Sequence, residues 1–195
     1  MSIRNGFLGY LLPAVVLASA GSASAFQGSP PVANADAKIL ADFNSRVGEY
    51  MKVRKKAGES RKLKKPVDSQ ASINRHQQIL AHEIREEREK ARQGDIFTPE
   101  IADVFRRLIA QASQGSKGVQ MKQSLKHAEP VNLVLKVNRA YPEELPLQSS
   151  PPTLLANLPA LPKELDFRVV GSNLILRDRE ANLIIDFFDQ AIKKP

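Results

Sequence analysis

The chain has 195 residues, with 29 lysines and arginines against 21 aspartates and glutamates, and a formal net charge of +8. It contains no cysteine, which excludes disulfides, thiol catalysis, thiolate metal sites and lipid attachment through cysteine within this sequence. Tryptophan is absent and only three tyrosines occur, so an aromatic platform for stacking bases is not expected and nucleic acid is an unlikely partner.

The first 25 residues have the organisation of a secretion signal. Arg4 supplies a positive charge, an apolar stretch follows from residue 7 to residue 17, and small residues form Ala-x-Ala sites ending at Ala20 and Ala25. The apolar stretch is shorter than the roughly 20 residues of a membrane-spanning helix, and no second run of that length follows. We therefore predict a signal peptide over residues 1–25 and export to the periplasm or the medium. Cleavage after Ala25 is favoured over cleavage after Ala20 or an uncleaved anchor.

Residues 26–35 are rich in Gly, Ser, Pro and Asn, which predicts a disordered leader. From Asp36 onward, apolar residues recur with helical spacing, at Ile39, Phe43 and Val47. This pattern predicts a helix that ends near Lys56. The basic residues that follow are expected to form a loop up to Pro66.

A second helix is predicted over residues 71–93, with an apolar stripe made of Ile73, Leu80 and Ile84. Its last turns are charged on nearly every side, and Glu86 and Lys90 have the i,i+4 spacing of a favourable ion pair. The pattern therefore predicts a solvated helical end that Gly94 closes.

A third helix has the clearest start signal in the chain. Thr98 is a good N-cap, Pro99 suits the first helical position, and Glu100 favours the positive end of the helix dipole. A broad apolar face then continues until Gly115. Three amphipathic helices with short connections are expected to pack on one another and bury their apolar stripes.

The second half of the chain has the pattern of strands. Alternation over residues 131–137 predicts a strand, and the six prolines of residues 141–162 predict an extended wrap anchored by leucines. Residues 165–170 and 174–177 flank Gly171-Ser172, which is typical of a type II′ hairpin. Residues 183–188 are predicted to form a third strand, with a short helix as the alternative. We expect an α+β fold in which three amphipathic helices precede the proline-rich wrap and a small antiparallel β-meander. Residues 36–118 form the helical region and residues 119–195 the strand-rich region, and residues 26–195 are expected to form one structural unit.

The positive charge is concentrated in one segment, residues 52–65, which we call the basic segment. The basic segment contains eight cationic residues and one acidic residue, Glu59, and the rest of the chain after residue 25 has equal numbers of basic and acidic residues. Such a segment gains roughly 1 kcal/mol per cation near an anionic surface. An anionic envelope component is therefore the expected partner, and a solvated loop is the alternative. The candidate binding residues are Lys52, Arg54, Lys55, Lys56, Arg61, Lys62, Lys64 and Lys65.

Candidate metal ligands and catalytic acids are few. His82 and Glu86 share a helix face, which leaves a metal-binding envelope protein as one alternative function. A metal site needs three or four converging ligands, however, so no metal site or cofactor is predicted. The acidic residues around the last hairpins, Asp178, Glu180 and Asp186, could serve an envelope-acting hydrolase, although acids at turns are usually turn formers. No nucleophile, phosphate-binding or dinucleotide motif is present, and the sequence favours a non-enzymatic binding or structural protein.

Two stretches carry a resemblance to a family. HQQILAHEIREEREKARQGDIFTPEIADVFRRLI covers residues 76–109, and PPTLLANLPALPKELDFRVVGSNLILRDREANLIIDFF covers residues 151–188. Both resemble a family of exported bacterial proteins to which no activity is assigned. The resemblance implies that the helical and strand-rich halves belong to one unit, and it implies no function.

Overall fold

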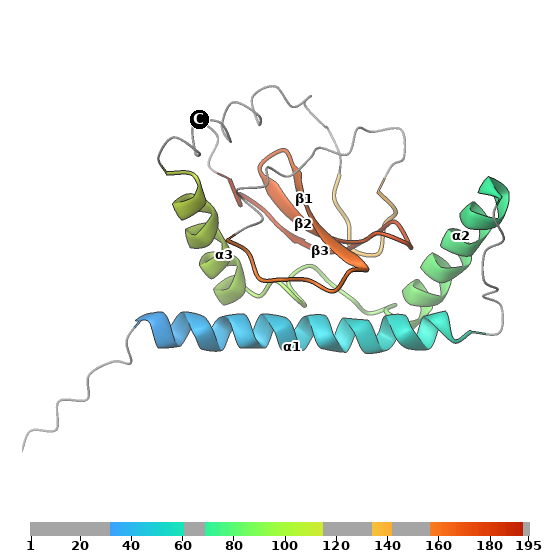
Figure 1. Ribbon diagram of the computed structural model, residues 1–195, viewed down its shortest axis with the longest axis horizontal. Helices are drawn as coiled ribbons and strands as arrows, with labels where there is room; N and C mark the ends of the chain where they lie inside the picture. Colours follow the sequence, from blue (N-terminus) through green and yellow to red (C-terminus); the bar gives the residue numbers. More distant parts are fainter. Residues whose placement is uncertain (1–31, 61–68, 115–133, 142–156, 193–195) are drawn as a thin grey trace, which may run out of the picture. The chain divides into compact units, whose positions relative to one another are not determined.

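The computed structural model of the chain describes residues 32–60, 69–114, 134–141 and 157–192, with side chains from residue 35 onward. These residues form three helices, α1 (Val32–Gly58), α2 (Gln70–Glu87) and α3 (Pro99–Ala112), followed by three strands, β1 (Leu165–Val170), β2 (Asn173–Asp178) and β3 (Leu183–Phe188). Figure 1 shows this arrangement, which confirms the α+β class with a small antiparallel sheet after the helices. The predicted signal peptide lies outside the described residues.

α1 begins four residues before the predicted start at Asp36. The segment that was assigned to a disordered leader therefore contributes residues 32–35 to the helix, and the leader prediction is wrong for them. Alanine has the highest helix propensity, and here it occupies alternate positions, Ala33, Ala35 and Ala37. The other end lies close to the prediction, because α1 continues two residues past Lys56 to Gly58.

The three strands form an antiparallel meander in the order β1-β2-β3, so the short-helix alternative for residues 183–188 is wrong. Gly171 has a φ of 61° at the β1–β2 turn, which is the left-handed value that the first position of a type II′ turn requires. Leu176 pairs with Asp186 and Arg177 pairs with Ile184, which leaves Ile185 as an extra residue. This bulge turns both Ile185 and Asp186 toward the helices.

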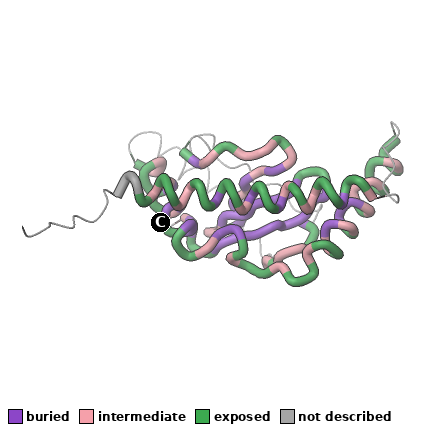
Figure 2. Tube along the Cα trace, turned by 90° about the horizontal axis from the view of Figure 1, so that it is seen from below, coloured by how far each residue is buried: buried purple, intermediate pink, exposed green. Residues whose placement is uncertain are grey.

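A cluster of five phenylalanines joins the sheet to α1 and α3. Ring centroids lie 4.9 Å apart for Phe43 and Phe105 and 5.0 Å apart for Phe97 and Phe188, in tilted and edge-on geometries. Phe167 of β1 completes the cluster against Phe105, at 5.8 Å. Figure 2 shows α1 crossing in front of buried strands, with its outer side exposed. The larger buried cluster of the described residues therefore lies between the helices and one face of the sheet.

The three helices do not bury their stripes equally. α3 starts as predicted, with the Thr98 side chain accepting a hydrogen bond from the Ile101 N–H and with Pro99 in the first turn. α2 buries Leu80, Ala81 and Ile84, but Ile73 near its start is exposed. The α2 stripe is therefore a contact surface only in its second half.

α2 ends at Glu87, six residues earlier than predicted, so Glu86 and Lys90 do not share a helix. Arg88, the residue that follows Glu87, has left the helical conformation, and its side chain turns inward and donates hydrogen bonds to the Asn138 Oδ1 and the Ile185 carbonyl. Its guanidinium also lies 5.2 Å from the centre of the Tyr50 ring. Burial lowers the pKa of Arg88 from its ordinary value. A side chain that sequence alone places on a solvated helical end is thus part of the interior.

Residues 134–141 cover part of the other face of the sheet. Leu135 and Val137 face the buried side chains of that face while Val134 is exposed, so the predicted alternation is correct. The predicted strand is wrong for residues 134–137, which have no strand pairing, and residues 131–133 lie outside the described residues. Asn138 has a φ of 62°, and a left-handed residue interrupts a strand. Pairing with β3 is limited to one bridge, between Ala140 and Leu183.

Of the proline-rich wrap, residues 142–156 lie outside the described residues. Two of its predicted leucine anchors are described, and both contact the core: Leu158 is buried and Leu161 is partly buried. The described end of this segment therefore behaves as predicted.

Candidate functional site

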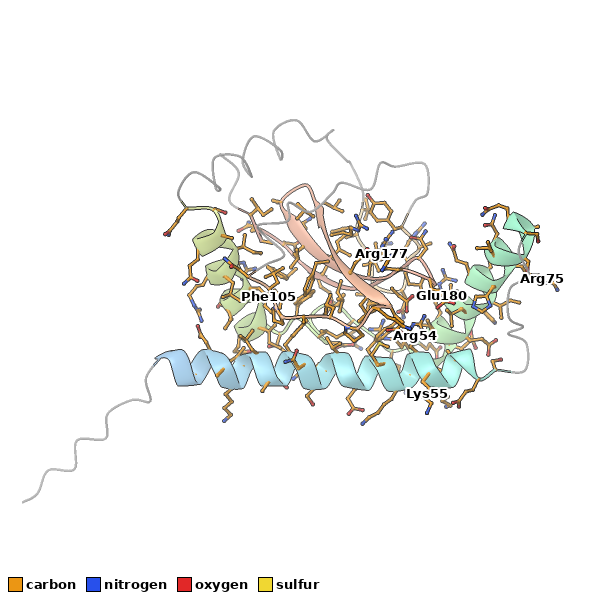
Figure 3. All side chains as sticks on the ribbon, in the orientation of Figure 1. Arg54, Lys55, Arg75, Phe105, Arg177 and Glu180 are labelled. Carbon is orange, nitrogen blue, oxygen red and sulfur yellow. The ribbon has the colours of Figure 1, made fainter. Side chains whose placement is uncertain are left out.

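The described cations of the basic segment point in two directions. The side chains of Lys52, Lys55 and Lys56 are 73%, 79% and 70% exposed, whereas the Arg54 side chain is 14% exposed. Figure 3 shows Lys55 projecting from the outer side of α1 and Arg54 directed toward the strands. The helical period explains the difference, because Arg54 lies four residues after buried Tyr50 and shares its face. Arg61, Lys62, Lys64 and Lys65 lie outside the described residues.

Each exposed lysine has an acidic neighbour. Lys52 contacts Glu49 at 2.7 Å, Lys56 contacts Glu87 at 2.7 Å, and Lys55 lies 3.9 Å from Glu59. Ion pairs between exposed groups are worth about 0–1 kcal/mol and weaken as salt rises. These lysines are therefore able to exchange their partners for another anion.

Arg54 takes part in a buried polar network at the junction of α1 and the sheet. Its Nε donates to the Asp178 Oδ2 at 2.7 Å, and the Tyr50 hydroxyl donates to the same oxygen at 2.7 Å. The other oxygen of Asp178 accepts the backbone N–H groups of Glu180 and Ala181, which shapes the β2–β3 turn. Asp178 is fully buried, so its carboxylate is a structural connection between α1 and the hairpin.

The network changes the protonation of its members. Burial raises the pKa of Tyr50, and the neighbouring Asp178 carboxylate raises it further, so the phenol stays neutral and remains a donor. Burial alone lowers the pKa of Arg54, but the carboxylates of Asp178 and Glu180 outweigh it and the pKa is raised. Both groups are therefore held in the form that binds Asp178.

Glu180 extends this network to α2. One of its carboxylate oxygens accepts a hydrogen bond from Arg54, and the other lies 2.9 Å from the His76 Nε2. Figure 3 shows Glu180 between α1 and α2. His76 is not among the candidate residues that the sequence indicates. The charges of residues 104 positions apart carry no local signal, so only the fold shows the pairing.

Asp186 is the second fully buried carboxylate. It accepts hydrogen bonds from four backbone N–H groups, those of Gly94, Ile96, Phe97 and Phe187. Desolvation raises the pKa of Asp186 above its ordinary value although these four donors act in the opposite direction. Asp186 therefore fastens the connection between α2 and α3 to β3.

The nominated catalytic acids do not meet at an open cleft. Asp178 and Asp186 are buried and bound to the donors described above, and Glu180 is half exposed beside an open depression lined by Lys163, Glu164 and Arg179. Glycoside hydrolysis requires two carboxyl groups about 5–9.5 Å apart that both face the substrate. Buried acids that are bound to structural donors do not form such a pair. Their placement favours the turn-forming and structural interpretation.

The nominated metal ligands, His82 and Glu86, are both exposed on α2. Among the described residues, no group of three or more His, Asp or Glu side chains is placed to hold a metal ion. The third histidine of the chain, His127, lies outside the described residues.

The function must be inferred from the fold and from the exposed lysines of the basic segment, because comparisons with known proteins identify no relative. None of the described helices has the length and apolar character needed to cross a lipid bilayer. The sequence matches no protein-family model, and neither a curated protein nor a solved structure shows significant similarity to it.

Proposed function

We propose that this chain is an exported, non-enzymatic binding protein that contacts an anionic envelope surface through the basic segment, residues 52–65. The observation that carries the proposal is the division of its described cations. Arg54 is used by the fold, whereas Lys52, Lys55 and Lys56 stand out from α1 into solvent. The binding face is thus narrower than the sequence implied, because Arg54 is removed from it.

A diffuse anionic surface suits this face better than a small anion does. The three lysines are point charges on flexible side chains on the outer side of α1, and each side chain is at least 70% exposed, so the protein does not enclose them. A phosphate-rich surface offers many equivalent partners, and each lysine near it contributes roughly 1 kcal/mol. The alternative, a hydrolase using Asp178, Glu180 or Asp186, has less support because two of these acids are buried in structural contacts.

The test is sedimentation of the purified protein with vesicles of phosphatidylglycerol and phosphatidylcholine. Substituting Lys52, Lys55 and Lys56 together by Gln removes about 3 kcal/mol of attraction, and the three internal ion pairs, at about 0.5 kcal/mol each, offset about half of it, so affinity should fall about tenfold. The matched control replaces three exposed lysines elsewhere, Lys38, Lys90 and Lys136, and lowers the net charge equally. Equal losses in the two variants would mean that only total charge matters, and no loss in the first would reject the proposed face.

Export is tested separately by determining the amino terminus of the protein outside the cytoplasm. We expect Phe26, and Gly21 would indicate the earlier site. Recovery of the intact chain from the cytoplasm alone would reject export without touching the binding experiment.

A further inference from the structure

Two arginines share one carboxylate on the face of the sheet that points away from the helices. Alternate residues of β1, beginning with Leu165, belong to the buried cluster on the helix side of the sheet. Successive side chains of a strand point to opposite faces, so Asp166 and Arg168 project from the other face. Arg177 of β2 pairs with Asp166 across the sheet and lies on that face as well. The fold therefore gathers three charged side chains from two strands at one place.

The two guanidinium groups use the Asp166 carboxylate differently. Arg177 binds it through a matched pair of hydrogen bonds, Nε to Oδ1 at 3.1 Å and Nη2 to Oδ2 at 3.0 Å, and its Nη1 donates to the Asn182 Oδ1. Arg168 directs both Nε and Nη2 to the single oxygen Oδ2, at 2.9 Å and 2.7 Å. The Arg168 Nη1 has no hydrogen-bond partner among the described residues, and since no buried side-chain nitrogen there lacks one, Nη1 is in contact with solvent. The Nη1–Nη2 edge of Arg168 is therefore open.

This group of side chains has an excess of positive charge. Two guanidinium groups face one carboxylate, and in the part of the chain that the structure describes no other acidic side chain contacts either arginine. The Tyr141 ring, 5.9 Å from the Arg177 guanidinium carbon, adds no negative charge, because burial raises the pKa of its phenol although both arginines act in the opposite direction. The side chains of Arg168 and Arg177 are only 23% and 8% exposed, so water compensates the excess charge less than it would at an open surface.

We propose that Arg168 and Arg177 form a binding site for an oxyanion, a carboxylate or phosphate group that the open edge of Arg168 holds through two parallel hydrogen bonds. A guanidinium group presents its donors in a planar fork that fits the paired oxygens of such anions. Arg177 adds positive charge, and Asp166 holds Arg168 in its orientation. Ile175 lies opposite Arg168 in the sheet and is fully buried, and an apolar neighbour strengthens the attraction between charges.

The oxyanion site is separate from the basic segment. Its arginines belong to β1 and β2, whereas the exposed lysines project from α1; Figure 3 shows Arg177 beside the strands and Lys55 on the far side of α1 from them. The site holds one anionic group by its geometry, while the lysines suit a diffuse surface. The inference is therefore independent of the proposed function, and either can fail without the other.

NMR spectra of the arginine Nε–H groups of the purified protein test the proposal. Sodium acetate or sodium phosphate is titrated to about 50 mM, because a single charged fork corresponds to binding in roughly the millimolar range. Sodium chloride keeps the ionic strength constant, so that screening does not change during the titration. The signals of Arg168 and Arg177 should shift and saturate. Saturation by acetate alone would identify a carboxylate ligand, and saturation by phosphate alone would identify a phosphate group.

Two variants of Arg168 separate the fork from the charge. Arg168→Gln removes both, and Arg168→Lys keeps the charge without the fork, so each should weaken binding at least about tenfold, followed on the Arg177 signal. The lysine variant retains the test if the loss of the Asp166 contacts unfolds Arg168→Gln. The matched control is Arg75→Gln, which removes an exposed arginine that Figure 3 shows on α2, away from Arg177, and it should bind as wild type does.

Three results would overturn the oxyanion site. The first is a shift of the Arg168 signal that grows without saturation, or that sodium chloride produces equally. The second is the same affinity in Arg168→Lys as in wild type. The third is a loss in Arg75→Gln as large as the loss in Arg168→Gln, because total charge would then explain the binding.

Discussion

Replacing Tyr50 by Phe tests whether the buried network between α1 and the sheet stabilises the fold. The substitution removes one hydroxyl, whose oxygen lies 2.7 Å from the Asp178 Oδ2, and it keeps the ring that packs under Arg88. No cavity larger than the hydroxyl results. The change therefore isolates one hydrogen bond to an ionised acceptor.

A hydrogen bond to a charged group contributes about 1.5–3 kcal/mol, more than one between neutral groups. Asp178 is fully buried and retains Arg54 and two backbone donors after the substitution, so it loses one of its four donors. We expect the free energy of unfolding to fall by about 2 kcal/mol. For a chain of this size the melting temperature should fall by roughly 4–8 °C.

Urea denaturation of wild type and the Tyr50→Phe variant measures this loss, and an unchanged m-value would show that the change lies in stability. A double-mutant cycle with Asp178→Asn then gives the coupling between the two side chains, which should exceed about 1 kcal/mol. A Tyr50→Phe variant within about 0.5 kcal/mol of wild type, or a coupling near zero, would refute the reasoning.

Four further substitutions probe other parts of the fold. Gly171→Ala should destabilise the fold by about 1 kcal/mol or more, because the φ of Gly171 is 61°. Gly48→Ala, on the exposed side of α1 with no atom within 4 Å of the new Cβ, should stabilise the fold by about 0.5–1 kcal/mol. Thermal melts in which both variants shift the melting temperature in the same direction would contradict this reasoning. Phe105→Ala should cost about 3–5 kcal/mol, since the ring is fully buried among four other phenylalanines, and a loss below about 1 kcal/mol by chemical denaturation would mean that the cluster is not the core. Asp186→Asn should change the pH dependence of stability. The raised pKa means that Asp186 binds its proton more tightly in the folded state, so its contribution to stability is largest at low pH and declines as the pH rises above 3.8. A variant whose unfolding free energy keeps the wild-type dependence on pH above 3.8 would contradict that direction.

Local patterns predicted the elements that depend on local chemistry. Thr98 and Pro99 start α3 as their preferences at helix N-termini imply, and Gly171 takes the turn that its position between two strands implies. The same kind of reasoning was wrong where a distant partner decides. α2 ends at Arg88, whose side chain binds Asn138 and Ile185, and neither partner can be read from the sequence around residue 88.

The candidate site follows the same division. Composition correctly places a concentration of cations at the end of α1, but only tertiary contacts separate Arg54 from Lys52, Lys55 and Lys56. Asp178 and Asp186 were nominated as acids because they are carboxylates near turns. Beside local backbone donors, each accepts hydrogen bonds from elements about 90 or more residues away along the chain, and these contacts cannot be read from the local sequence.

The attachment of Asp186 to the Ile96 and Phe97 amides has a consequence for the order of folding during synthesis. The bond to Phe97 joins residues 89 positions apart, and it closes the core only when β3 is present. At roughly 5–20 residues per second, a ribosome needs about 4–18 s to add those residues. Contacts of such long range also slow folding once the chain is complete. During that interval the helical half lacks the sheet that covers its apolar faces in the complete fold, so these faces stay without their native partner until β3 has been made.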